Sequence, residues 1–189
     1  HQSLDAYVNQ ILNNEMKMQE TTFNPDDSIW PRIVPTDPGI NMRLIKKPGT
    51  VRNTITRTFN GVAGHAGLFS TARDLAILAT MYLNDGDING KNIFTKSTID
   101  NFSKKQSKHS TRALGWDTAN GNQNNKIANL FSENAFGHTG FTGTSIWIDP
   151  TFDLYIILLT NRTYEMTDRS LIKEFRPRIH DYIIKCTIN

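Results

Sequence analysis

The pattern of apolar positions predicts an amphipathic helix at the start of the chain. Ser3 is a residue type that caps helices, and apolar side chains then recur every three or four residues. This apolar face carries Leu4, Val8, Ile11, Leu12 and Met16. From about residue 22 to residue 50 the periodicity is lost, and prolines keep the chain extended or turning. We expect a long loop there, of the kind that is usually functional or covers a neighbouring segment.

The middle of the chain is predicted to be mainly helical. Thr71 and Asp74 have the spacing of a capping box, and Asp85-Gly86 ends the apolar pattern that follows. The apolar positions of this helix are Leu75, Leu78, Ala79 and Tyr82. Farther along, Asn89-Gly90 is typical of a turn, and Thr95 can cap a short helix.

Strands are predicted in the last third of the chain, after a short strand near Trp116. Residues 144–148 and 154–160 are apolar runs separated by Asp149-Pro150, which predicts an antiparallel hairpin. The second run, LYIILLT, is apolar on both faces, as is typical of a central strand covered on both sides. Three glycines and several small hydroxyl residues lie within residues 137–145. Glycines at a strand indicate a bulge, or a place where another backbone or a ligand approaches closely.

A C-terminal helix is predicted from about residue 168 to residue 184. Its apolar stripe carries Leu171, Ile172, Phe175, Ile179 and Ile183. Pro177 lies inside this stretch and should kink the helix or divide it into two segments. The order helix, loop, helix, hairpin, helix predicts an α+β fold.

Composition and charge exclude several classes of function. The 189 residues are enough for one domain with a sizeable core, or for a large part of a bigger one, and the net charge is only +3. The densest basic stretch, residues 104–112, has no interleaved aromatic residues, so we expect no nucleic-acid binding. Cys186 is the only cysteine, which excludes an internal disulfide and a thiolate metal cluster. No apolar run approaches the length that spans a membrane.

Two segments of the chain resemble a known family. Residues 136–162 read FGHTGFTGTSIWIDPTFDLYIILLTNR, and with the helix that follows they resemble the last part of the serine β-lactamase and penicillin-recognising family. The similarity is to its class C, esterase and DD-peptidase-like branch. Residues 61–76, GVAGHAGLFSTARDLA, resemble an earlier segment of the same branch, in the expected order. The resemblance implies a β-lactamase/transpeptidase-like fold, with helices flanking an antiparallel sheet and with the N-terminal elements outside this chain.

The third motif of that family is K-T-G or H-T-G, and it would be His138, Thr139 and Gly140 here. The resemblance implies that this strand is a sheet edge along which substrate lies like an added strand. His138 would supply a proton or a positive field, and Thr139 would offer a hydroxyl to a substrate carboxylate or carbonyl. Gly140 would leave room for the substrate backbone, and the backbone N–H of Phe141 would be an oxyanion-hole donor.

Two further residues are candidates for substrate binding. Thr142 follows the third motif, and His65 lies in the earlier matching segment, where it either lines the cleft or satisfies a turn. Neither His65 nor His138 has metal-ligand spacing to another His, Asp or Glu, so we expect no metal and no cofactor. Trp116 and Trp147 are expected to be packing residues.

The family also needs S-x-x-K, with the nucleophile, and usually Y-x-N, both of which precede the segment that residues 61–76 resemble. We therefore expect residues 1–189 to be the C-terminal part of one domain, divided into 1–60, 61–135 and 136–189. Tyr7-Val8-Asn9 and Ser170 with Lys173 spell the two motifs by chance in this interpretation. A rearranged active site built from them is the alternative.

Three functions remain open. The parent protein is a serine hydrolase that acts on a β-lactam, a cell-wall peptide or a small ester through an acyl-enzyme, with its nucleophile outside this chain. Alternatively, the chain is a binding module that holds such a molecule without turnover, or a structural domain. Expected partners are a small-molecule or peptide substrate, the missing N-terminal half, or another copy of the chain. The resemblance suggests the periplasm or cell envelope.

Overall fold

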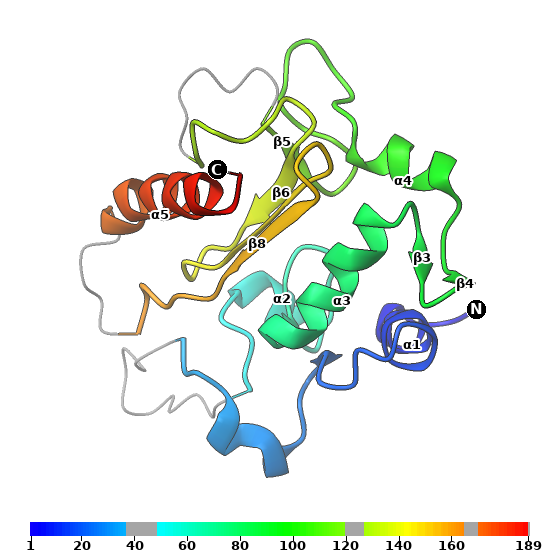
Figure 1. The fold of residues 1–189 in the computed structure, drawn as a ribbon. Helices are drawn as coiled ribbons and strands as arrows, with labels where there is room; N and C mark the ends of the chain where they lie inside the picture. Colours follow the sequence, from blue (N-terminus) through cyan, green and yellow to red (C-terminus); the bar gives the residue numbers. More distant parts are fainter. Residues whose placement is uncertain (37–48, 120–126, 165–169, 189) are drawn as a thin grey trace. The chain divides into compact units, whose positions relative to one another are not determined.

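Figure 1 shows the computed structural model, which describes residues 1–36, 49–119, 127–164 and 170–188. The chain divides into two compact units. Unit 1 comprises residues 1–77 and 161–167, and unit 2 comprises residues 78–160 and 168–189. The boundary between residues 77 and 78 falls inside helix α3 (Ala72–Leu83). The expectation that all 189 residues form part of one domain stays a prediction.

Unit 1 begins with the predicted helix. It consists of α1 (Leu4–Asn9) and a π-helical continuation, η1 (Gln10–Glu15). The apolar face of this helix is not buried: Leu4 is 43% exposed, and burial starts only at Met16, just after the helix. The other elements of unit 1 are β1 (Thr22–Phe23), η2 (Asp27–Arg32), α2 (Thr54–Thr58) and β2 (Leu68–Phe69). β1 pairs antiparallel with β2.

The start of α3 is capped only partly as the sequence predicts. The Thr71 hydroxyl accepts from the backbone N–H of Asp74 at 3.3 Å, which is half of a capping box. The buried Asp74 carboxylate instead accepts from the Thr21 hydroxyl at 2.7 Å and from the backbone N–H of Glu20 at 2.8 Å. The carboxylate therefore ties α3 to a segment more than fifty residues away in sequence.

Unit 2 contains a four-stranded antiparallel sheet in the order β5-β6-β7-β8. The strands are β5 (Asp117–Thr118), β6 (Phe136–Thr139), β7 (Ser145–Asp149) and β8 (Leu154–Leu158). The predicted hairpin is β7-β8, which confirms that assignment. The remaining elements are the small hairpin β3 (Asp87–Ile88) and β4 (Lys91–Asn92), helix α4 (Lys96–Ser103), capped by Thr95, and helix α5 (Leu171–Ile188).

The two faces of this sheet are covered by different helices, because side chains alternate along each strand. On one face, Phe136 lies opposite Ile148, and both pack against Ala79 in the last turns of α3. On the other face, Gly137 lies opposite Trp147, and a Cβ atom on Gly137 would lie 2.5 Å from the indole ring. Trp147 is fully buried there, as the packing interpretation predicts.

Within the described residues, strand β8 lies at the edge of the sheet, whereas its sequence predicts a central strand. It ends the order of the described sheet, and Tyr155 and Leu159 are exposed. Only Ile156 is buried within the strand, where it packs with Ile184 of α5. The most buried strand is β7, which pairs on both edges. Within the described part of the chain, the face that carries Ile156 is packed, and the face that carries Tyr155 and Leu159 is exposed.

Helix α5 runs through Pro177 as one element, so the predicted division into two segments is wrong. The predicted apolar stripe is also wrong in part, since Leu171 and Phe175 are 60% and 47% exposed. The buried positions of the helix are Ile172, Arg176, His180 and Ile184. They repeat every four residues, and two of the four are polar. Their partners, described below, explain why the helix is rotated in this way.

Candidate active site

The predicted third motif lies at the end of β6 and in the turn that leads to β7. His138 and Thr139 pair with Ile146 and Ser145 of β7, while the ladder with β5 extends only to Gly137. β6 is thus an inner strand of the described sheet, and only its end has the edge character that the sequence interpretation requires. Alternation along β6 directs the side chains of His138 and Thr139 to opposite faces. A ligand that contacts both must lie at the strand end.

The exposed His138 ring is held by two hydrogen bonds. Its Nδ1 lies 3.0 Å from the backbone oxygen of Thr139, and its Nε2 lies 2.7 Å from Nη1 of Arg112. A carbonyl oxygen can only accept and a guanidinium can only donate. In these two contacts Nδ1 is therefore the donor and Nε2 the acceptor. Arg112 brings its guanidinium charge to this strand end.

The turn of residues 140–144 joins β6 to β7 and carries the remaining candidates. The backbone N–H of Gly140 donates to Thr144 O at 2.8 Å, and that of Gly143 donates to Gly140 O at 3.2 Å. A Cβ atom on Gly140 would lie 2.1 Å from the Thr144 hydroxyl, so a larger residue there would require the Thr144 side chain to move. Phe141 is 60% exposed at the tip, and Thr142 is half-buried.

Helix α5 contacts this turn from one side through buried polar side chains. Nη2 of Arg176 donates to Gly143 O at 3.1 Å and to Thr144 O at 3.2 Å. One turn along the helix, Nδ1 of His180 donates to Ile127 O at 3.0 Å, and its Nε2 lies 3.4 Å from the Ser145 hydroxyl. Burial lowers the pKa of His180 from 6.5 to about 4, and the nearby charge of Arg176 acts in the same direction.

His65 belongs to unit 1 and is described within that unit alone. Its Nε2 lies 3.2 Å from the hydroxyl of Thr56, which is fully buried and also bonds to Asn53. The ring itself is exposed. This contact is consistent with the turn-satisfying role that the sequence left open, and a role in substrate binding stays a prediction.

The two short matches to family motifs, Tyr7-Val8-Asn9 and Ser170 with Lys173, lie in or beside helices, as the sequence interpretation predicts. Tyr7-Val8-Asn9 is part of α1 in unit 1, and Tyr7 is 51% exposed. Ser170 immediately precedes α5, and Lys173 lies in its first turn with both residues exposed. The backbone N–H of Lys173 donates to Ser170 O at 2.8 Å, which is an ordinary helix start.

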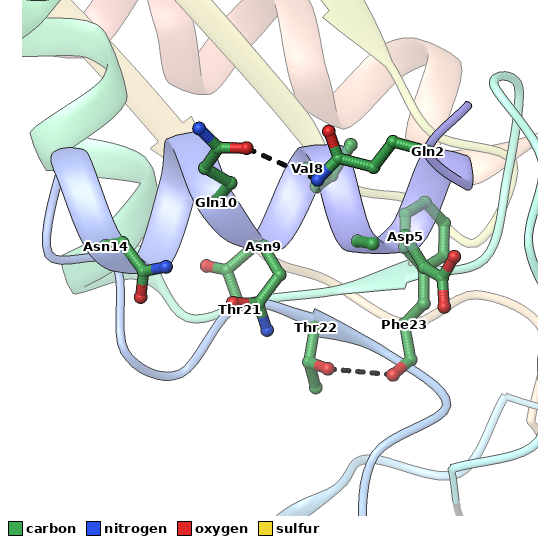
Figure 2. A pocket seen from close by; sticks show the side chains of 10 residues that line it. Gln2, Asp5, Val8, Asn9, Gln10, Asn14, Thr21, Thr22 and Phe23 are labelled. Carbon is green, nitrogen blue, oxygen red and sulfur yellow. Dashed lines mark hydrogen bonds between the residues drawn. The ribbon is translucent and has the colours of Figure 1, made fainter.

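Unit 1 has a cavity of about 520 Å³ beside α1, η1 and β1 (Figure 2). Amide side chains surround much of it, and the amide of Gln2 donates to Gln10 Oε1 at 3.3 Å. The residues that line it are Gln2, Asp5, Ala6, Val8, Asn9, Gln10, Asn14, Thr21, Thr22 and Phe23. None of the predicted site residues is among them. The cavity is therefore distinct from the strand end that the sequence points to.

Comparison with known proteins decides the family. The family model for Beta-lactamase matches residues 1–178. This chain belongs to the Beta-lactamase family. A solved β-lactamase from Mycobacterium bovis aligns with a TM-score of 0.63 and 18% identity, over 96% of this chain and 55% of that one. This likeness confirms the predicted α+β, β-lactamase/transpeptidase-like fold.

Two relatives of this Beta-lactamase-family chain are closer in sequence. An N-acetylmuramyl-L-alanine amidase from Bacillus subtilis (strain 168) is 36% identical over 176 residues. A protein from Salmonella typhi that bears a D-alanyl-D-alanine carboxypeptidase name is 32% identical over 175 residues. In both cases the match covers 85% of this chain and 40% of the relative. The chain therefore spans less than half the length of these relatives.

Sequence reasoning missed three residues that contact the candidate site: Arg112, Arg176 and His180. Arg112 ends the basic stretch of residues 104–112, which no sequence pattern connects with His138, and only the fold brings the two together. The sequence does carry a signal for Arg176 and His180: they continue the four-residue spacing of Ile172 and Ile184, which places all four side chains on one face of the helix. Among the described residues, no helix is long and apolar enough to cross a membrane.

Proposed function

We propose that this chain is part of a serine hydrolase that acts on an amide or an ester, with a β-lactam, a cell-wall peptide or a small ester as substrate. The observation that carries the proposal is the position of the third motif in a chain of the Beta-lactamase family. The motif lies at the open end of β6, next to the turn of residues 140–144, whose carbonyls accept hydrogen bonds from Arg176. Both closer relatives bear names of enzymes that cleave amide bonds in cell-wall components. A cell-wall peptide is therefore the substrate class that we favour.

The reaction is acyl transfer. A serine oxygen attacks the substrate carbonyl carbon and its proton passes to a base, while the carbonyl oxygen becomes an oxyanion. The bond to the leaving amine or alcohol then breaks as that group takes a proton, and water releases the acyl group in a second round. The chain spans 40% of its relatives, so we propose that serine and base come from outside residues 1–189.

The strand end supplies binding and electrostatics in this proposal. The backbone N–H of Phe141 donates to the oxyanion, and Thr139 offers its hydroxyl to the substrate. His138 supplies a proton or a positive field near the reacting group, and Arg112 places its guanidinium 2.7 Å from the Nε2 atom of that ring. Thr142 lies at the edge of the same turn, where it contacts the substrate chain.

The test uses the complete protein with His138→Ala, and His109→Ala as the matched control. His109 is an exposed histidine of the same unit, in the loop before Arg112. If His138 acts on the substrate, its removal should lower kcat by about 10²–10⁴-fold, the usual range for a positioned acid or base. His109→Ala should leave kcat unchanged. Turnover of a peptide ending in D-alanyl-D-alanine and of a nitrophenyl ester, with the melting temperature of each preparation, gives both quantities.

Two results would contradict the proposal. An unchanged kcat with a melting temperature several degrees lower would make His138 a structural residue. A complete protein that binds the peptide but forms no covalent adduct with a labelled penicillin and turns over neither substrate would instead be a binding module.

A further inference from the structure

Arg176 is a buried charged residue at a position where packing alone would favour an apolar side chain. Arg176 is 7% exposed in the middle of α5, where an aliphatic residue would match Ile172 and Ile184 on the same stripe. Burying a guanidinium is unfavourable unless its donors are satisfied. Its Nη2 atom donates to two consecutive backbone carbonyls, those of Gly143 and Thr144. The contact joins α5 to the turn between β6 and β7.

The same turn is held at a second point by Thr160, two residues after the end of β8. The Thr160 hydroxyl donates to Gly143 O at 2.7 Å, so this one carbonyl accepts from both Thr160 and Arg176. Gly143 has a φ of +116°, a conformation that other residues rarely adopt, and a Cβ atom there would lie 2.7 Å from the Thr160 hydroxyl. The unusual backbone conformation and the two donors occur at one peptide group.

We propose that Arg176 is a positioning residue of the active site, which fixes the turn of residues 140–144 and thereby the backbone of Phe141. This inference rests on the proposed function, because it assigns the turn to the oxyanion site. A donor to an oxyanion must be held in place before the reaction, and a small displacement of a catalytic group lowers the rate strongly. Arg176 does not touch the substrate; it acts through the carbonyls of Gly143 and Thr144.

The test compares Arg176→Met, Arg176→Lys and Arg178→Met in the complete protein. Arg178 is an exposed arginine of the same helix, so its replacement makes the same change of charge and size without touching the turn. Arg176→Met should lower kcat by about 10–100-fold and change KM by less than about 3-fold, because the loss falls on the transition state. Arg176→Lys, which keeps a donor, should recover part of kcat, and Arg178→Met should match the wild type.

Hydrogen exchange separates positioning from a general loss of stability. In Arg176→Met the amides of Gly140 and Gly143 should exchange faster, while the amide of Trp147 in the middle of β7 keeps its protection. A decrease of protection throughout the sheet, or an unchanged kcat with a faster-exchanging turn, would overturn the proposal. A wild-type protein without turnover would refute the proposed function. The exchange measurement would then still decide whether Arg176 holds the turn.

A second variant covers the case in which Arg176→Met does not fold. Thr160→Val removes the other donor to Gly143 O and keeps the shape of the side chain. It should accelerate exchange at Gly143 and lower kcat in the same direction, by about 3–10-fold, since one of two donors remains. Unchanged exchange and unchanged kcat in this variant would contradict the proposal independently.

Discussion

Mild acid should destabilise unit 2 through His180. The imidazole is fully buried on α5, donates from Nδ1 to Ile127 O, and has a pKa of about 4 instead of 6.5. In the unfolded chain the ring takes up its proton near pH 6.5, whereas in the folded protein it stays neutral down to about pH 4. The unfolded state therefore binds more protons between these values, and the free energy of unfolding falls as the pH falls through this window.

The size of the effect follows from the two pKa values. A difference of about 2.5 units corresponds to about 3 kcal/mol, present in full above pH 6.5 and lost by about pH 4. At about pH 5 roughly 2 kcal/mol is already lost. Two charges on the same helix face the ring: Arg176 disfavours its protonation and Asp181 favours it. Burial is the larger cause, so salt should change the effect little.

The assay is urea unfolding of the purified chain, followed by tryptophan fluorescence, at about pH 7 and about pH 5 and at one protein concentration. The comparison variant is His180→Gln, which keeps an amide donor and does not titrate. The wild type should lose about 2 kcal/mol more than the variant between the two pH values. An equal loss in both proteins would show that other groups govern the acid sensitivity and would refute the reasoning.

Three further predictions concern stability, association and activity. The buried Asp149 carboxylate accepts hydrogen bonds from Ser132 N, Ser132 Oγ and Thr151 N. Asp149→Ala should therefore destabilise the fold by about 3 kcal/mol, and Asp149→Asn should destabilise it less. Equal midpoints of urea unfolding for the two variants would contradict this. The chain alone should associate through exposed apolar side chains of residues 154–159 and of α5, Leu159 and Phe175 among them. A protein that is monomeric by light scattering and melts cooperatively would count against this. The chain alone should not turn over a chromogenic cephalosporin or a nitrophenyl ester. An acylation burst that disappears in Ser170→Ala would favour the rearranged site instead.

Local signals in the sequence predicted local structure well. The helix cap at Thr95 and the hairpin around Asp149-Pro150 were identified correctly, because each depends on residues within a few positions of one another. Strand β6 was harder to delimit, since two glycines in and after it weaken the pattern of alternation. Its pairing with both β5 and β7 depends on register, which only the fold sets.

The misassignment in α5 has a physical cause. An apolar stripe is expected to face the core, and Leu171 and Phe175 compete for that face with Arg176 and His180. Hydrogen bonds to carbonyls of the turn and of residue 127 favour the polar pair, and these partners lie more than thirty residues away in sequence. The contact of Arg112 with His138 spans twenty-six residues and could not be predicted from the sequence for the same reason. The candidate site was therefore predictable as a motif but not as a set of contacts.

The braced turn has a thermodynamic consequence for ligands. Its carbonyls are held from α5 and from the end of β8, so little conformational entropy remains for binding to remove. A ligand at Phe141 would then gain affinity without an ordering penalty, but the turn could not reshape itself around ligands of different width. Differences in ligand preference between relatives of this fold should therefore arise from the side chain at the position of Arg112, which reaches the strand end from outside the turn.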